Sequence, residues 1–229
     1  MAIPTFRVIS IGALAAHPLW EESRPVRTGH ATSTLVESGD TRILVDPGLP
    51  PAAMLARLSE RAPRPASAIT HVFLTRLDPE HARGITAFPN AAWLVNEPER
   101  DAAIATLREQ LEHARETGDP ETEAMASERL ELAERTRPAP DRLADGVDLF
   151  PLPGVTPGSC GLLLPLPIRT ILIAGDAVAT REHLLQAKVL PGCHDVDLAM
   201  ESFREAIEIA DELVPGRDEA MVNPARRGF

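Results

Sequence analysis

The stretch "ITHVFLTRLDPEHARG" (residues 69–84) begins as an apolar run and ends in a loop rich in charge. Its β-branched first half predicts a buried strand. The loop then brings together one arginine, two carboxylates and one histidine, namely Arg76, Asp78, Glu80 and His81. Polar groups on a loop that follows a buried strand are typical of a functional site, because the scaffold holds the loop in place. The loop has the form of a metal-binding loop, or of one whose metal ligands have been replaced.

Four further turns of this kind follow predicted strands or the last predicted helix. They are "LVDPG" at 44–48, "LPGVTPGS" at 152–159, "IAGDAV" at 173–178 and "VPGRDEA" at 214–220. The first ends a predicted hairpin over residues 31–48, which turns at Ser38-Gly39-Asp40. A helix is predicted after Pro51, and a last helix over about residues 196–213. Strands and helices therefore alternate in two halves, as in two facing sheets with helices outside.

Residues 97–137 separate the two halves and differ from both in composition. They are charged and rich in alanine, and apolar residues recur there at intervals of three and four positions. Gly118-Asp119-Pro120 interrupts the pattern. The segment is therefore predicted to be a helical hairpin inserted into one domain of residues 1–229. A solvated insertion that covers the core is favoured over a dimer arm or a lid above a pocket, and a homodimer stays open.

Composition excludes several classes of partner. Of the 229 residues 44% are hydrophobic, only 3% are aromatic and none is tyrosine, so few rings are present to stack on bases. A formal net charge of −11 repels phosphate backbones and anionic lipid surfaces alike. The two cysteines, Cys160 and Cys193, form no zinc or disulfide pattern. We therefore expect a cytoplasmic protein that binds neither nucleic acid nor membrane.

The order and wording of the five turns resemble the metallo-β-lactamase superfamily. The loop at 76–81 stands where that family has H-x-H-x-D-H, and "PGVTPGS" where it has P-G-H-T-P-G-S. "IAGDAV" resembles the strand that ends in its metal-bridging aspartate, and "VPGR" stands for V-P-G-H. The resemblance implies an αββα sandwich, of α/β (α+β) class, with two facing mixed sheets, outer helices and a site along one edge.

Carried over position by position, the resemblance leaves few of the family's metal ligands in place. His81 and Asp176 are unchanged, whereas the aspartate of the loop has become Glu80. The four remaining histidines are replaced by Arg76, Asp78, Val155 and Arg217. Arginine cannot ligate a metal, because its guanidinium stays protonated and has no free lone pair. The dinuclear centre is therefore predicted to be lost, with no cofactor.

Charge balance suggests what the two arginines do. Asp78, Glu80 and Asp176 would be crowded carboxylates in a partly dry cleft, a situation that requires balancing positive charge. We expect guanidinium–carboxylate pairs of Arg76 and Arg217 to supply this charge in place of the metal ions. Asp46 is expected to support the neighbouring loop through hydrogen bonds to amides. His30 and His194 lie on loops that border the cleft and are candidates for replacement nitrogens.

Three functions remain open from sequence. The first is a noncatalytic pseudoenzyme that binds a small anionic ligand or a partner. The second is a hydrolase of esters or related bonds with one divalent metal ion (zinc, manganese or iron), held by Asp78, Glu80, His81 and Asp176. The third is a structural protein that oligomerises through the helical hairpin. We favour the first, because three of the seven ligand positions now hold Arg76, Val155 and Arg217.

Overall fold

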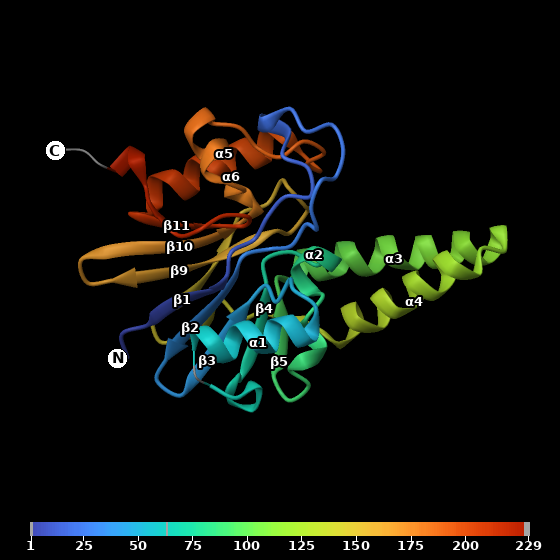
Figure 1. Cartoon of the computed structure of the whole chain (residues 1–229), viewed down its shortest axis with the longest axis horizontal. Coiled ribbons are helices and arrows are strands. Elements are labelled where there is room, and N and C mark those ends of the chain that lie inside the picture. The colour runs from blue at the N-terminus through green and yellow to red at the C-terminus, as the bar shows by residue number, and fades with distance from the viewer. Residues whose placement is uncertain (1, 63, 227–229) are drawn as a thin grey trace.

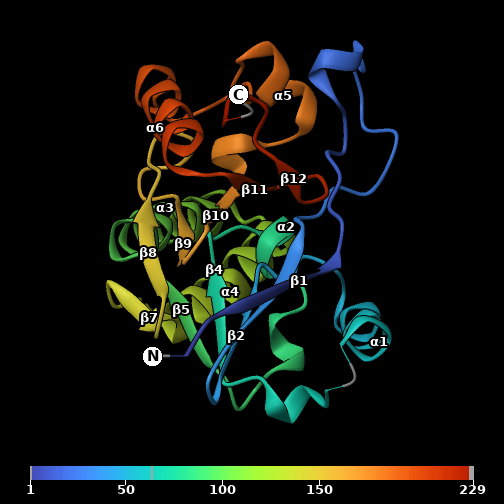
Figure 2. The same cartoon turned by 90° about the vertical axis from the view of Figure 1, so that its left-hand side faces the viewer.

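The computed structural model describes residues 2–62 and 64–226. Within these residues two six-stranded sheets face each other, and helices cover both outer faces (Figure 1 and Figure 2). This arrangement confirms the predicted αββα sandwich. The helices are α1 (Pro51–Arg61), α2 (Pro79–Ala82), α3 (Glu97–Thr117), α4 (Pro120–Arg135), α5 (Arg181–Gln186) and α6 (Val196–Ile209).

The first sheet is mixed. Its strands, in order across the sheet, are β1 (Thr5–Ser10), β2 (Ser33–Ser38), β3 (Thr41–Val45), β4 (His71–Leu74), β5 (Ala92–Val95) and β6 (Arg137–Pro138). β1, β2 and β3 pair antiparallel, and β3 to β6 pair parallel. The predicted hairpin turn is present, because Ser38 pairs with Thr41 around the left-handed Gly39.

The second sheet has one parallel pair in an otherwise antiparallel order. Its strands are β12 (Met221–Val222), β11 (Glu212–Pro215), β10 (Arg169–Gly175), β9 (Cys160–Leu166), β8 (Val147–Pro151) and β7 (Arg142–Ala144). β11 pairs parallel with β10, so the last helix ends at Ile209 and the prediction that it continues to Leu213 is wrong. Leu213 and Val214 are buried in the sheet. These apolar residues, which seemed to extend the helix, therefore belong to a strand.

Three layers of buried apolar side chains hold the sandwich together. β4 shows how one strand serves two of them. Phe73 packs between the sheets, against residues such as Ile171 of β10, whereas its neighbours Val72 and Leu74 face α1 and α3. A third layer, around Phe203 of α6, covers the outer face of the second sheet. Because successive side chains of a strand point to opposite faces and both faces of β4 are buried, residues 72–74 are all apolar.

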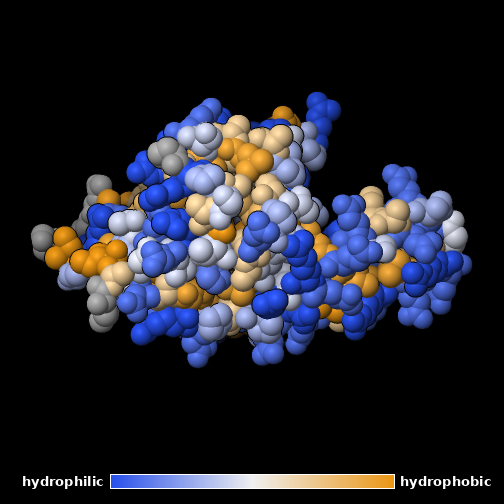
Figure 3. Space-filling model, turned by 90° about the horizontal axis from the view of Figure 1, so that it is seen from below, coloured by the Kyte–Doolittle hydropathy of each residue, from blue (hydrophilic) through white to orange (hydrophobic). Residues whose placement is uncertain are grey.

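The helical hairpin of α3 and α4 projects from the sandwich (Figure 1). Gly118 ends α3 with a left-handed φ of 67°, and the Asp119 side chain caps α4 by accepting from the Thr122 amide. Ile104 and Leu107 of α3 join the core at the base of the hairpin. Farther out its surface is mainly hydrophilic, with some hydrophobic residues along its length (Figure 3). None of the described helices combines the length and apolar composition that a membrane span requires.

The parallel strand pairs bring the polar turns to one edge. β3 and β4 run parallel in one sheet, and β10 and β11 run parallel in the other. The carboxyl ends of parallel strands lie at the same edge of a sheet. Asp46 follows β3, the 75–81 loop follows β4, Asp176 follows β10 and Arg217 follows β11. The strand order therefore places these residues around one cleft.

Candidate functional site

Asp176 lies at the centre of the candidate site. Its side chain is fully buried, and it follows Gly175, whose left-handed φ of 54° turns the chain out of β10. The Arg217 Nε and Nη2 groups donate to the two carboxylate oxygens at 2.9 Å each. Arg76 Nη1 donates to Oδ2 at 3.0 Å. The carboxylate that would bridge two metal ions therefore accepts three hydrogen bonds from guanidinium groups.

Arg217 is held in this position by its backbone as well as by its charge. Its side chain is only 4% exposed, and its amide donates to the Ala179 carbonyl oxygen at 2.8 Å. The residue before it must be glycine, because a Cβ on Gly216 would lie 2.3 Å from Asp176 Oδ1. Arg217 Nη1 also forms an ion pair with the Glu80 carboxylate. Arg217 therefore joins the α2 loop to the second sheet.

The 75–81 loop forms the other half of the site. Asp78 caps α2, since its Oδ1 accepts from the Glu80 amide at 2.8 Å. Its Oδ2 lies 2.5 Å from Arg76 Nε, a close ion pair that is not oriented as a hydrogen bond. Both of its oxygens lie 3.0–3.1 Å from Nδ1 of His81. Asp78 therefore contacts both positive groups of its own loop.

His81 is completely buried between two carboxylates. Its Nδ1 faces Asp78, and its Nε2 lies 3.6 Å from Asp176 Oδ2 without a hydrogen-bond partner in the described residues. Burial acts to lower the pKa of the imidazole, but Asp78 and Asp176 outweigh it and the pKa is raised. Asp78 and Asp176 therefore act to stabilise the protonated form of the ring.

The charges of the site stabilise one another. Burial acts to raise the pKa of Asp176, yet Arg217, His81 and Arg76 hold this pKa below its ordinary value. The pKa of Asp78 is lowered in the same way, against burial, by His81 and Arg76. Asp176 raises the pKa of Arg217 against the opposing effect of burial. The two guanidinium groups pair with the carboxylates of Asp78, Glu80 and Asp176, as the sequence hypothesis of guanidinium–carboxylate pairs predicted.

Asp46 supports the loop from below. It has a left-handed φ of 47° and is 1% exposed. Its carboxylate accepts from the Thr75 amide at 2.8 Å and from the Thr75 hydroxyl at 2.7 Å. These bonds agree with the predicted supporting role. Burial, the largest influence, raises the pKa of Asp46 to about 6.

The raised pKa of Asp46 makes stability depend on pH. A group whose pKa is higher in the folded state stabilises the fold at low pH, and this contribution is lost as the pH rises through the folded pKa. Asp46→Asn removes the titration. The free energy of unfolding of the native protein minus that of the variant should therefore fall by roughly 2 kcal/mol between pH 4 and pH 7. Urea denaturation across this range measures it, and a difference that is independent of pH would contradict the assignment.

The remaining predicted residues lie around the site without completing it. Val155 is 7% exposed on the 152–159 loop, and its side chain has no atom that could ligate a metal. The ring nitrogens of His30 lie 3.2 Å from the carbonyl oxygens of Thr28 and Ile11. His194 is exposed, and its amide donates to the carbonyl oxygen of Val155. Neither ring contributes a nitrogen to the charged cluster, which consists of Arg76, Asp78, Glu80, His81, Asp176 and Arg217.

Glu99 positions the site and has no sequence signal that would separate it from other acids near a helix start. It is 3% exposed in the first turn of α3. Its carboxylate accepts from the Leu77 amide at 2.9 Å and from the Gly158 amide at 3.2 Å. Glu99 therefore ties the 75–81 loop to the 152–159 loop, two segments that sequence alone does not connect.

A second polar cluster borders the cleft and was also missed. The hydroxyl of Thr180 lies 2.9 Å from Nδ1 of His183 and 3.3 Å from Nε2 of His17. His17 stacks on Trp20, with ring centroids 4.1 Å apart, and contacts Glu182. These contacts fasten the 12–30 loop to the start of α5. No spacing in the sequence links His17 with His183, since the two residues meet only through the fold.

The residues present do not fit the two-zinc centre that the resemblance implies. Arg217 and Arg76 donate three hydrogen bonds to Asp176, which leaves its two oxygens little capacity for a pair of metal ions, and the Val155 side chain has no atom that could ligate one. Over residues 2–62 and 64–226, no group of three or more His, Cys, Asp or Glu side chains is arranged to hold a metal ion. A cation approaching Asp176 would also meet two fixed positive charges.

Solved structures share this fold at low sequence identity. A provisionally named metallo-beta-lactamase of Thermotoga maritima is 17% identical, with a TM-score of 0.69 over 96% of this chain and 99% of that one. AidC, described as a dizinc quorum-quenching lactonase, is 17% identical, with a TM-score of 0.65 over 91% and 87%. A mutant of AiiA from B. thuringiensis with N-decanoyl-L-homoserine bound is 18% identical, with a TM-score of 0.63 over 91% and 89%.

Curated proteins offer no match to the sequence. The family model of the metallo-beta-lactamase superfamily matches residues 26–220, which include all seven positions that correspond to metal ligands. The match therefore covers most of the chain, from the loop before β2 to the turn after β11. The chain belongs to the metallo-beta-lactamase superfamily.

Proposed function

We propose that this chain is a noncatalytic member of its superfamily, which works without a metal ion and binds a small anionic ligand. The observation that carries the proposal is the pairing of Arg217 with both oxygens of the buried Asp176. Planar, two-point pairing of this kind is among the stronger hydrogen-bonded arrangements in proteins. It uses the oxygens on which a dinuclear metal site of this fold would depend.

The energetics of the site support the same conclusion. A metal ion that entered would have to displace Arg217 and Arg76 from Asp176, leaving two guanidinium groups without their partner. Arg217 has a side chain that is only 4% exposed, so water cannot readily replace the carboxylate. Metal binding would therefore have to offset the loss of this charge network as well as the dehydration of the ion.

A hydrolase with one metal ion is the alternative from a different class. AidC and AiiA are related in fold, and the first is described as a dizinc lactonase. The candidate ligands here are Asp78, Glu80, His81 and Asp176, and each carboxylate among them already pairs with a guanidinium group. The arrangement favours the noncatalytic function. No observation favours assembly through the helical hairpin, which stays a prediction.

The charge balance also bears on how an anion would be recognised. Arg76 and Arg217 lie at the centre of the cleft and could attract an anion, but both are paired with carboxylates. An anion that bound them would have to displace those partners. Recognition of an anionic ligand therefore requires positive side chains outside the charged cluster.

A hydrolase screen tests the proposal. The protein is incubated with ester and lactone substrates and added zinc, manganese or iron, beside a His81→Ala variant. We expect no metal-dependent turnover above the variant, because no open coordination position is available for an activated water. Turnover that depends on the metal and is abolished by His81→Ala would overturn the proposal in favour of the hydrolase.

A further inference from the structure

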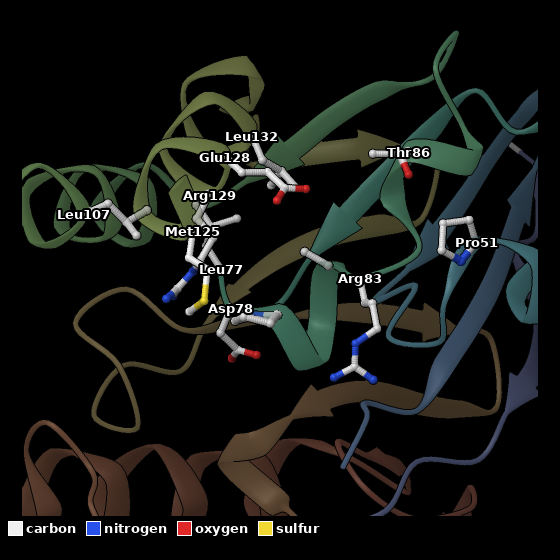
Figure 4. A pocket seen from close by; sticks show the side chains of 12 residues that line it. Pro51, Leu77, Asp78, Arg83, Thr86, Leu107, Met125, Glu128, Arg129 and Leu132 are labelled. Atoms are coloured by element: carbon white, nitrogen blue, oxygen red, sulfur yellow. The ribbon is translucent and has the colours of Figure 1, made fainter. Parts of the chain in front are cut away.

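A cavity of about 470 Å³ lies beside the charged cluster, between α2 and the helical hairpin (Figure 4). Its walls come from the first residue of α1, the segment 77–86 that contains α2, and the two helices of the hairpin, α3 and α4. The lining is largely apolar and includes Leu77, Pro79, Ala82, Leu107, Met125 and Leu132. A concave, mainly apolar space of this size, with a few polar groups at its border, is typical of a small-molecule site.

Two arginines border this cavity without a carboxylate partner in the described part of the chain. Arg83 follows α2 directly, and Arg129 lies on α4. Both are partly buried, and neither takes part in a side-chain hydrogen bond or ion pair with another described residue. Figure 4 shows both side chains extending toward the side of the cavity on which Asp78 lies. Arg76 and Arg217, in contrast, both pair with carboxylates.

The two acids of the lining do not neutralise these arginines. Asp78 pairs with Arg76 and His81. Glu128 is exposed to solvent and forms no ion pair with a described residue. With Asp78 already paired, Arg83 and Arg129 outnumber the one remaining acid, Glu128, and the border carries an excess of positive charge next to apolar walls. An arginine in such surroundings binds a carboxylate favourably, since the pair is only partly exposed to water.

Resting on the proposed noncatalytic function, we propose that this cavity binds a free medium-chain carboxylic acid. The alkyl chain lies against the apolar walls, including Leu107 and Leu132, and the carboxylate lies toward Arg83 and Arg129. Neither part alone explains the lining, because an uncharged chain would leave the arginines without partners and a small inorganic anion would leave the apolar walls in water. The hairpin thereby serves as one wall of a ligand site.

Calorimetric titration with hexanoate, octanoate and decanoate tests this inference. Each added CH₂ that becomes buried should raise the affinity about fourfold, the equivalent of about 0.8 kcal/mol, until the cavity is filled. Octanol, which has the chain without the charge, should bind at least tenfold more weakly than octanoate. An affinity that does not change with chain length would contradict burial of the chain.

Variants separate the two arginines from general charge effects. The double variant Arg83→Gln, Arg129→Gln should weaken octanoate binding at least tenfold and leave octanol binding unchanged. Arg108→Gln is the matched control, since Arg108 lies on α3, is paired with Glu134 and does not line the cavity. It should bind octanoate as the native protein does. Equal weakening by Arg108→Gln and the double variant would overturn the assignment.

Metal content, measured on the same preparations, separates this inference from the proposed function. Metal-free protein that fails to bind any of the three acids sinks the inference and leaves the noncatalytic function standing. Protein that contains zinc and hydrolyses esters sinks the proposed function, whatever its affinity for octanoate.

Discussion

Replacing Arg217 with methionine is expected to lower the free energy of unfolding by about 3–5 kcal/mol, because it leaves a buried carboxylate without its main partner. Asp176 has a fully buried side chain, and Arg217 occupies both of its oxygens. Arg76 reaches only one of them. Urea denaturation at pH 7 measures the loss, and methionine keeps most of the side-chain volume, so that the effect reports charge.

The matched control is Arg169→Met on the same sheet. Arg169 pairs with Glu212 at 2.6 Å, but its side chain is 47% exposed. Exposed pairs contribute little, so the loss should be below about 1 kcal/mol. Similar losses in the free energy of unfolding for the two variants would show that the pair of Arg217 with Asp176 contributes no more than an exposed ion pair.

Restoring the four lost imidazoles is expected to change the metal content from well below one zinc ion per chain to at least one. The variant carries Arg76→His, Asp78→His, Val155→His and Arg217→His. It removes both fixed cations from the site and adds nitrogen donors beside His81 and Asp176, which are already buried there. Zinc prefers such a mixture of imidazole and carboxylate ligands. Elemental analysis and the shift of the melting temperature on zinc addition both measure the result.

Val155→His alone is the control for this variant. It supplies one imidazole but leaves Arg76 and Arg217 paired with Asp176. No gain of zinc is expected, because the obstacle is the positive charge rather than the missing donor alone. A quadruple variant that folds, as judged by its circular dichroism and cooperative unfolding, yet binds no zinc would mean that the four positions do not converge on one metal site.

Most of the fold could be predicted because its information is local. Each polar turn follows an apolar run, and the resemblance of these turns, in their order, to the metallo-β-lactamase superfamily implied the sandwich. The break of the hairpin at Gly118 is equally local, since a left-handed residue is needed there. The end of α6 was misplaced because a buried apolar residue such as Leu213 is compatible with either a helix or a strand. Only its pairing next to β10 decides between them.

The site was predictable where the resemblance placed opposite charges in one cleft. Arg76, Arg217 and Asp176 meet as expected, because guanidinium groups in a cleft with buried carboxylates must pair with them. Glu99 could not be identified, because its partners are backbone amides on two loops distant in sequence. Arg83 and Arg129 were not singled out from the sequence, because only the fold brings them to one cavity and no motif contains them. The cytoplasmic location, the homodimer and the single domain stay predictions.

Elemental analysis of protein purified without any chelator tests the central claim most directly. The claim is that guanidinium groups have taken the place of the metal ions around Asp176. The account predicts well under one equivalent of zinc, manganese or iron per chain, and no increase after incubation with excess zinc followed by gel filtration. One or more ions retained per chain, and lost in Asp176→Asn, would contradict it.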